Sequence, residues 1–240
     1  GSRRQVDFRH LGSPFGPGAR AVGSAQVMEV DLAPATEEDL LQVAEVFTEA
    51  FPESLLHTWG RIPETAMTAE AFRLCLDAEP DAFWVARRGR LVVGYAFTPF
   101  HLALLWQTAV LHGHLLRWAW RALNGRYHVG RHPLQVIFAN KWSFLQSALD
   151  RRYNVPSRIL SVAVRPTYQG RGIATALLRR GLDYLDRRGA RQVRLEVRPG
   201  NAPAEALYTR LGFQVVGRTR DSQGPWLIMV RSRPGLQPAD

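Results

Sequence analysis

Residues 161–175 read SVAVRPTYQGRGIAT, an apolar run that ends at Pro166 and is followed by two glycines one residue apart. A segment of good helix formers, ALLRR, begins directly afterwards at Ala176. This order predicts a strand, a tight turn and a helix, because glycine adopts backbone conformations that other residues avoid. Such a turn directs backbone N–H groups and the positive end of a helix dipole at an anion. The stretch therefore predicts an anion site, with the rest of the chain arranged around it.

Two common phosphate motifs are incomplete in this stretch. The dinucleotide fingerprint G-x-G-x-x-G would need a third glycine where Thr175 stands, and the P-loop would need Gly-Lys-Ser/Thr, which does not occur in the chain. A glycine turn between a strand and a helix also occurs in proteins that bind no ligand there. The stretch alone therefore does not distinguish an anion site from a plain structural turn.

Composition predicts a globular protein with a real core. The chain has 240 residues, 46% of them apolar, and its lone cysteine, Cys75, excludes an internal disulfide framework. No secretion signal and no uninterrupted apolar run of membrane-spanning length is seen, so we expect a cytoplasmic protein. Gly1 and Ser2 resemble a cloning scar, and residues 1–26, rich in Gly, Pro and Arg, read as a disordered tail.

The net charge of +10 is unevenly distributed along the chain. Counting Arg and Lys against Asp and Glu gives +3 for residues 1–26, −8 for 27–99, +7 for 100–158 and +8 for 159–240. Only one of the 31 basic residues is a lysine, which indicates a compositional bias towards arginine. An anionic ligand or surface is the alternative explanation. No nucleic-acid motif accompanies the arginines, so no nucleic-acid partner is expected.

Periodicity predicts an order of elements before and after this stretch. Before it we expect a strand at 27–32, a helix capped by Thr36 and ended by Pro52, a short helix at 69–76, and a hairpin of strands 82–86 and 91–97. After it we expect a helix at 173–188, a strand at 192–197, a helix at 204–211 opened by Asn201 and ended by Gly212, and strands at 213–216 and 226–230.

Residues 100–158 interrupt this order and read as a helical insertion. Residues 102–124 and 134–149 form two apolar helical segments, and five of the seven histidines lie in the insertion. Only the pair His112-x-His114 has metal-ligand spacing, so no metal is expected. Three roles are open for the insertion: a lid or homodimer surface, the lining of an acyl pocket, or peripheral contact with an anionic membrane.

The chain resembles the GNAT family of N-acetyltransferases at this point. The pattern Val164-x-Pro166-x-x-Gln169-x-x-Gly172-x-Ala174 is similar to the family's acetyl-CoA motif. LEV at 195–197, Asn201 and ALYTRLGF at 206–213 resemble its fifth strand and the helix that follows. The resemblance is specific over 159–216 and loose over 27–99. It implies an α/β (α+β) fold, a mixed, mostly antiparallel sheet flanked by helices, in one domain over 27–240 with the insertion between the third and fourth strands.

The resemblance also implies a site for acetyl-CoA, as acetyl donor, and for an amine acceptor. The backbone of the strand would pair with the pantetheine arm, the turn and helix start would hold the pyrophosphate, and Asn201 would bind the arm. The implied cofactor-binding residues are Val162, Ala163, Val164, Gln169, Gly170, Arg171, Gly172, Ile173, Ala174, Thr175 and Asn201. The implied catalytic residues are Tyr208, as the acid that protonates the leaving thiolate, and Glu196, as a general base.

Each implied role has a structural alternative. Tyr208 would serve as a packing residue, Asn201 as an N-cap only, and Glu196 as an ion-pair partner of Arg194 or Arg198, while Cys75 reads as core. At the level of the protein, direct acetyl transfer to a primary amine competes with transfer of a longer acyl chain and with a non-catalytic acyl-CoA-binding module. The acceptor itself, whether a protein N-terminus, a lysine, an aminoglycoside, a polyamine or an amino sugar, is not readable from the sequence.

Overall fold

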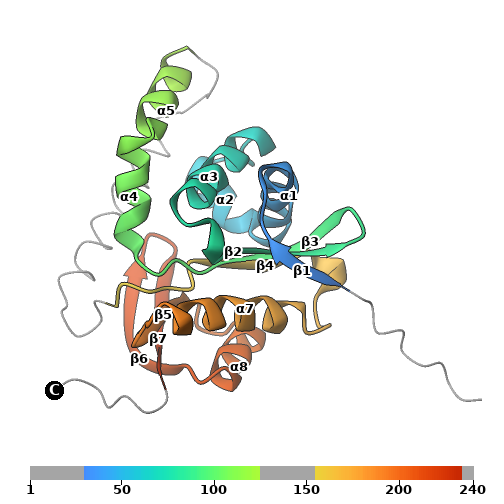
Figure 1. Ribbon diagram of the computed structural model, residues 1–240, viewed down its shortest axis with the longest axis vertical. Helices are drawn as coiled ribbons and strands as arrows, with labels where there is room; N and C mark the ends of the chain where they lie inside the picture. The colour runs from blue at the N-terminus through green and yellow to red at the C-terminus, as the bar shows by residue number, and fades with distance from the viewer. Residues whose placement is uncertain (1–29, 125–154, 234–240) are drawn as a thin grey trace, which may run out of the picture.

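The computed structural model describes residues 30–124 and 155–233 (Figure 1). The expected tail at 1–26, the first residues of the expected strand at 27–32 and the second insertion segment at 134–149 lie outside these ranges. Within them, the elements follow the expected order, with one additional helix, one expected helix split into two, and several longer elements.

Two sheets form the frame of the domain. The first is antiparallel in the order β1-β2-β3-β4, with β1 Asp31–Pro34, β2 Phe83–Arg88, β3 Leu91–Phe97 and β4 Ser161–Val164. The second is antiparallel in the order β5-β7-β6, with β5 Gln192–Val197, β6 Gln214–Asp221 and β7 Gly224–Ser232. The expected hairpin around Gly89 is confirmed, and its positive φ of 59° explains why glycine stands there.

Helices cover both faces of the first sheet (Figure 1). One face carries α1 Leu40–Ala50, α2 Pro52–Trp59 and α3 Thr65–Ala78, and the other carries α7 Ile173–Arg187. The helix α8, Ala202–Arg210, lies beyond α7 beside the second sheet. This arrangement covers both sides of β2 and β3, which fits the apolar sequence of β2 from Phe83 to Ala86 and of β3 along its length.

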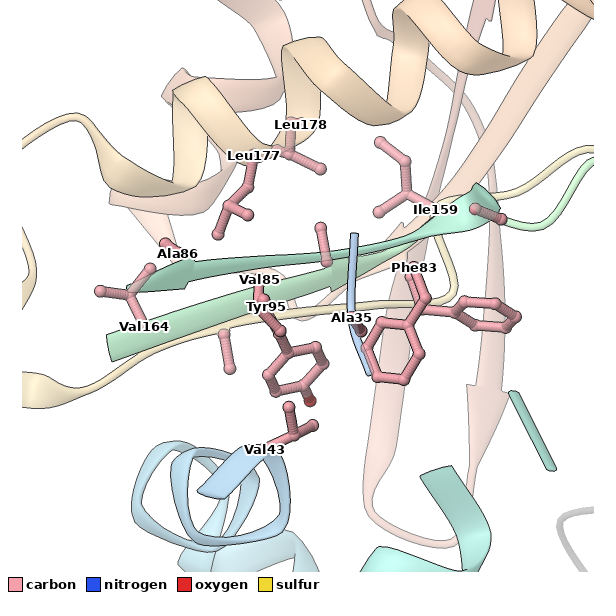
Figure 2. Close-up of a cluster of buried hydrophobic side chains, with 14 of the residues drawn as sticks. Ala35, Val43, Phe83, Val85, Ala86, Tyr95, Ile159, Val164, Leu177 and Leu178 are labelled. Carbon is pink, nitrogen blue, oxygen red and sulfur yellow. The ribbon is translucent and has the colours of Figure 1, made fainter. Parts of the chain in front are cut away.

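The core consists of two layers separated by the strands. Figure 2 shows Phe83, Tyr95 and Val43 on the α1 side, and Leu177 and Leu178 on the α7 side. All five are buried. Aromatic rings contact one another on the α1 side, with the Phe83 and Tyr95 centroids 6.1 Å apart in an edge-to-face arrangement. This packing holds β3, and through it β4, in a fixed position.

Several element boundaries differ from the predicted ones, and two of these differences lie at a proline or a glycine. Pro52 follows α1 as expected, but it also begins α2 at the position where its missing N–H costs nothing. The single helix expected at 102–124 is two helices, α4 Leu102–Leu111 and α5 His114–Leu123, broken at Gly113 with a φ of 70°. The helix expected at 69–76 and the last two strands are longer than predicted.

The helices α4 and α5 lie between β3 and β4 in the chain and extend past α3 (Figure 1). Arg121 of α5 forms an ion pair with Glu70 of α3 at 2.5 Å. Among the side chains of these two helices that the structure describes, five large apolar ones are exposed: Trp106, Val110, Leu111, Leu116 and Trp120. Among the described residues, no helix combines the length and apolar character needed to cross a bilayer.

Candidate functional site

The strands β4 and β5 meet at one point and then separate. Just before β4 begins, Ile159 N–H donates to the Arg194 carbonyl at 2.9 Å, and Arg194 N–H donates to the Ser157 carbonyl at 3.0 Å. Beyond this parallel bridge, β4 pairs with β3 and β5 pairs with β7. Because the two strands belong to different sheets from there on, the edge of β4 that faces β5 is left without a strand partner in the described part of the chain.

The register of β4 decides which backbone groups face this gap. Ala163 stands opposite Tyr95, and Arg165 N–H donates to the Val93 carbonyl at 2.9 Å. In an antiparallel pair, alternate residues direct their N–H and C=O groups to opposite sides. Val162 and Val164 therefore direct theirs toward the β5 side. The Val164 carbonyl accepts a hydrogen bond from the Gln169 side chain at 3.0 Å, which leaves the two N–H groups and the Val162 carbonyl facing the gap.

The glycine turn continues directly from this edge. Gly170 and Gly172 have φ values of 74° and 78°, so a residue with a side chain would be strained at either position. A Cβ at either position would contact nothing within 4 Å, which means that the space in front of the turn is open. The two glycines predicted from the sequence thus form the expected turn.

The first turn of α7 presents a set of backbone donors to that open space. The first intrahelical bond runs from Ala176 N–H to the Gly172 carbonyl at 3.0 Å, so the N–H groups of Ile173, Ala174 and Thr175 have no partner within the helix. No side chain caps the helix, and its first turn contains no acidic residue. These are the conditions under which a helix start binds phosphate oxygens.

Arg171 lies at the exposed rim of this turn. Its guanidinium lies over the ring of Tyr168, 5.5 Å from the centroid, and donates to the Thr167 carbonyl at 3.1 Å. These contacts hold a positive charge next to the unpaired N–H groups. A charge-assisted contact between Arg171 and a bound anion is therefore compatible with the geometry.

Tyr208, on α8, is 8% exposed and packs edge-to-face on Phe213 with the ring centroids 6.1 Å apart. Within the described ranges no hydrogen bond to its hydroxyl is found. Burial raises the pKa of Tyr208 to about 12, so the phenol keeps its proton at neutral pH. Tyr208 is thus a packing residue, and its hydroxyl also carries a proton that it can donate at neutral pH.

Glu196 is the only described carboxylate within ion-pair distance of two buried guanidinium groups. Its Oε1 lies 2.7 Å from Arg194 Nη2 and 3.0 Å from Arg158 Nη1. Arg194 is 0% exposed and Arg158 is buried, and burial lowers the pKa of Arg158, an effect to which the neighbouring Arg194 charge adds. The predicted pairing with Arg194 is confirmed. Arg158 was missed because it joins the site only through the bridge between β4 and β5.

Arg198, the other predicted partner of Glu196, belongs to a different cluster. It forms an ion pair with Asp221 at 2.9 Å and lies 3.8 Å over the ring centroid of Trp226. The turn between β6 and β7 also contacts α2, where His57 Nε2 lies 3.0 Å from Ser222 Oγ. Sequence reasoning missed this cluster because its members come from three separate segments without a common motif.

Asn201 has the N-cap role that was one of its two sequence interpretations. Its Oδ1 accepts a hydrogen bond from Ala204 N–H at 3.3 Å, and the Gly200 N–H donates to Glu205 Oε1 at 2.9 Å. The side chain is exposed. A bond from its amide group to a ligand remains compatible with this arrangement, because Oδ1 alone makes the cap.

Sequence comparison finds relatives of the segment that contains the glycine turn. Residues 147–213 match the model of the acetyltransferase (GNAT) family. The [ribosomal protein bS18]-alanine N-acetyltransferase of Escherichia coli K12 is 47% identical over 55 residues, which are 23% of this chain and 37% of that protein. Mycothiol acetyltransferase of Saccharomonospora viridis is 49% identical over 77 residues, 31% of this chain and 25% of that protein. The matched segment thus spans well under half the length of these relatives.

Structural comparison extends the likeness over most of the chain. SsHAT matches with a TM-score of 0.61 and 24% identity, covering 85% of this chain and 98% of that one. The structure of yncA from Salmonella typhimurium, solved with its cofactor acetyl-CoA, matches with a TM-score of 0.54 and 19% identity, covering 88% and 98%. The sequence match to the acetyltransferase (GNAT) family model is thus confined to residues 147–213, which include the glycine turn, while the likeness in fold extends over most of the chain.

Proposed function

We propose that this protein transfers the acetyl group of acetyl-CoA to a primary amine by direct attack in a ternary complex. The observation that carries the proposal is one continuous line of backbone donors. It begins at the unpaired edge of β4 and runs into the open N–H groups between Gly170 and Thr175. A molecule with an amide-bearing arm attached to a diphosphate has acceptors for both parts of this line, and coenzyme A has that structure.

The order of the donors sets the direction of the bound cofactor. The diphosphate takes the turn that follows β4, so the thioester lies toward the beginning of β4, near the bridge at Ile159 and Arg194. The pantetheine amides pair with Val162 and Val164 as an added strand would. We expected a backbone N–H near Val164 to polarise the thioester carbonyl oxygen, which becomes negative as the amine attacks; with the thioester at the beginning of β4, we propose the Val162 N–H for this role.

The chemical step forms one bond and breaks one. The amine nitrogen bonds to the carbonyl carbon, the carbon–sulfur bond breaks, and the thiolate takes a proton from Tyr208. Glu196 has two proposed roles: it balances the charges of Arg158 and Arg194 through Oε1, and its Oε2 accepts the proton that the amine loses. The two guanidinium contacts support the first role more directly than the second.

Calorimetry with matched glycine variants tests the cofactor site. Gly172→Trp fills the open space before α7, whereas Gly189→Trp places the same side chain at the other end of α7, at a glycine with φ 82° and equally open surroundings. We expect acetyl-CoA to bind the wild type and Gly189→Trp but not Gly172→Trp. Absence of binding to the wild type, or equal loss in both variants, would contradict the proposal.

Transfer of a longer acyl chain is the second candidate, because α4 and α5 expose Trp106, Leu111 and Leu116 in the segment that precedes β4. Comparison of kcat/KM for acetyl-CoA and decanoyl-CoA over one amine panel separates the two. A higher value for decanoyl-CoA supports the longer chain. Binding without turnover of either donor over the whole panel would instead support a non-catalytic module.

A further inference from the structure

Three side chains with metal-ligating atoms meet where α4 turns into α5. Asp77 lies near the end of α3, His112 ends α4, and His114 begins α5. One carboxylate oxygen and one ring nitrogen of each histidine all lie within 4.8 Å of one another. The sequence displayed only the pair His112-x-His114. The fold adds a third ligand from another helix, which changes the expectation that no metal binds.

His114 is the buried member of this cluster. Its side chain is 1% exposed, and its Nε2 lies 2.9 Å from Asp77 Oδ2. Its Nδ1 is buried and has no hydrogen-bond partner in the described part of the chain. The two ring nitrogens point in different directions, so Nε2, and not Nδ1, is the atom that His114 contributes to the cluster. A bound metal ion takes the lone pair of Nε2.

We propose that Asp77, His112 and His114 bind a divalent transition-metal ion of the zinc type. Two imidazole nitrogens and one carboxylate oxygen are a ligand set that Zn²⁺ accepts in tetrahedral geometry, whereas Mg²⁺ and Ca²⁺ prefer oxygen ligands throughout. Asp77 and His112 are exposed, so water completes the coordination from the solvent side. The buried His114 fixes the inner side of the site.

The metal has a structural role in this position. Gly113, between the two histidines, has a φ of 70° and forms the corner at which the chain changes direction. An ion held by both histidines and by Asp77 ties this corner to α3, beside which α4 and α5 lie (Figure 1). It acts together with the Arg121–Glu70 ion pair, which joins α5 to α3 at a second point. Binding of the ion thus sets the direction of the two helices.

Titration of the full chain with Zn²⁺ alone, followed by calorimetry, tests the site. His112→Ala is the decisive variant, because His112 is exposed and its removal leaves the packing of the helices in place. His57→Ala is the matched control, since it removes another exposed histidine, which lies on the helix α2 and outside the cluster. We expect one Zn²⁺ per chain, an affinity lowered by at least about 10-fold in His112→Ala, and an unchanged affinity in His57→Ala.

Co²⁺ supplies a readout that does not depend on heat of binding. A tetrahedral His₂Asp site gives visible d–d absorption with Co²⁺, which we expect in the wild type and not in His112→Ala. Circular dichroism of the two variants confirms that both are folded. The proposal is overturned if the wild type shows no saturable Zn²⁺ binding, or if His112→Ala binds Zn²⁺ and Co²⁺ as the wild type does.

Discussion

Glu196→Gln removes the carboxylate charge next to Arg158 and Arg194 and leaves two buried guanidinium groups. Removing one partner of a buried ion pair costs about 3–5 kcal/mol of unfolding free energy. The Glu196 side chain is 26% exposed, so water screens part of its interaction with the two arginines. We therefore expect the loss of unfolding free energy to lie near the lower limit, about 3 kcal/mol. For a domain of this size, that corresponds to a fall in Tm of about 6–12 °C.

Urea unfolding at pH 7 measures this loss against a matched surface pair. Glu45→Gln removes a carboxylate that lies 2.8 Å from Arg165 but is 49% exposed, and it should cost less than about 1 kcal/mol. Adding Arg158→Met to Glu196→Gln removes one of the two buried charges and should restore at least about 1 kcal/mol. A loss below about 1 kcal/mol for Glu196→Gln, together with a fall in kcat of at least about 100-fold, would refute charge balance and establish the general-base role.

Three further predictions concern other positions. Tyr208→Phe should lower kcat by about 100-fold in steady-state assays with little change in KM, because it removes the proton donor and keeps the packing on Phe213; an unchanged kcat would leave Tyr208 a packing residue. Gly181→Ala should cost about 1–2 kcal/mol in urea unfolding, because its Cβ would lie 2.5 Å from Thr98 Cγ2, and Thr98→Ala should restore stability in the double variant. Burial raises the pKa of the partly buried Cys75 thiol to about 12, so iodoacetamide at pH 8 should label it more slowly in the native than in the unfolded protein; equal labelling rates would contradict this.

Local chemistry made part of this protein predictable. The strained backbone at Gly170 and Gly172 accepts only glycine readily, so their spacing reported the turn directly. The positive φ of Gly89 made the hairpin predictable in the same way. Local side-chain chemistry predicted the cap at Thr36, whose N–H and hydroxyl both donate to Asp39 at 2.8 Å. These features depend on residues that are neighbours in the chain.

Features that depend on distant residues were not predictable. Arg158 reaches Glu196 because β4 and β5 share one bridge before they part, and Asp77 reaches His114 because α5 packs beside α3. The break at Gly113 was missed because a single glycine in a helical pattern costs only about 1 kcal/mol, which does not decide whether the helix continues. The packing of α5 decides whether the helix continues past Gly113.

The amino-acid sequence is sufficient to predict the glycine turn and most of the elements around it, because backbone preferences and hydrophobic periodicity act over a few residues. It does not contain the gap between β4 and β5, which exists only because one strand joins the first sheet and the next joins the second. Nor does it show which charges are buried together, since burial is a property of the packed chain. The proposed cofactor site at the edge of β4 has the same origin, because the outward-facing N–H groups of this strand result from the separation of the two sheets.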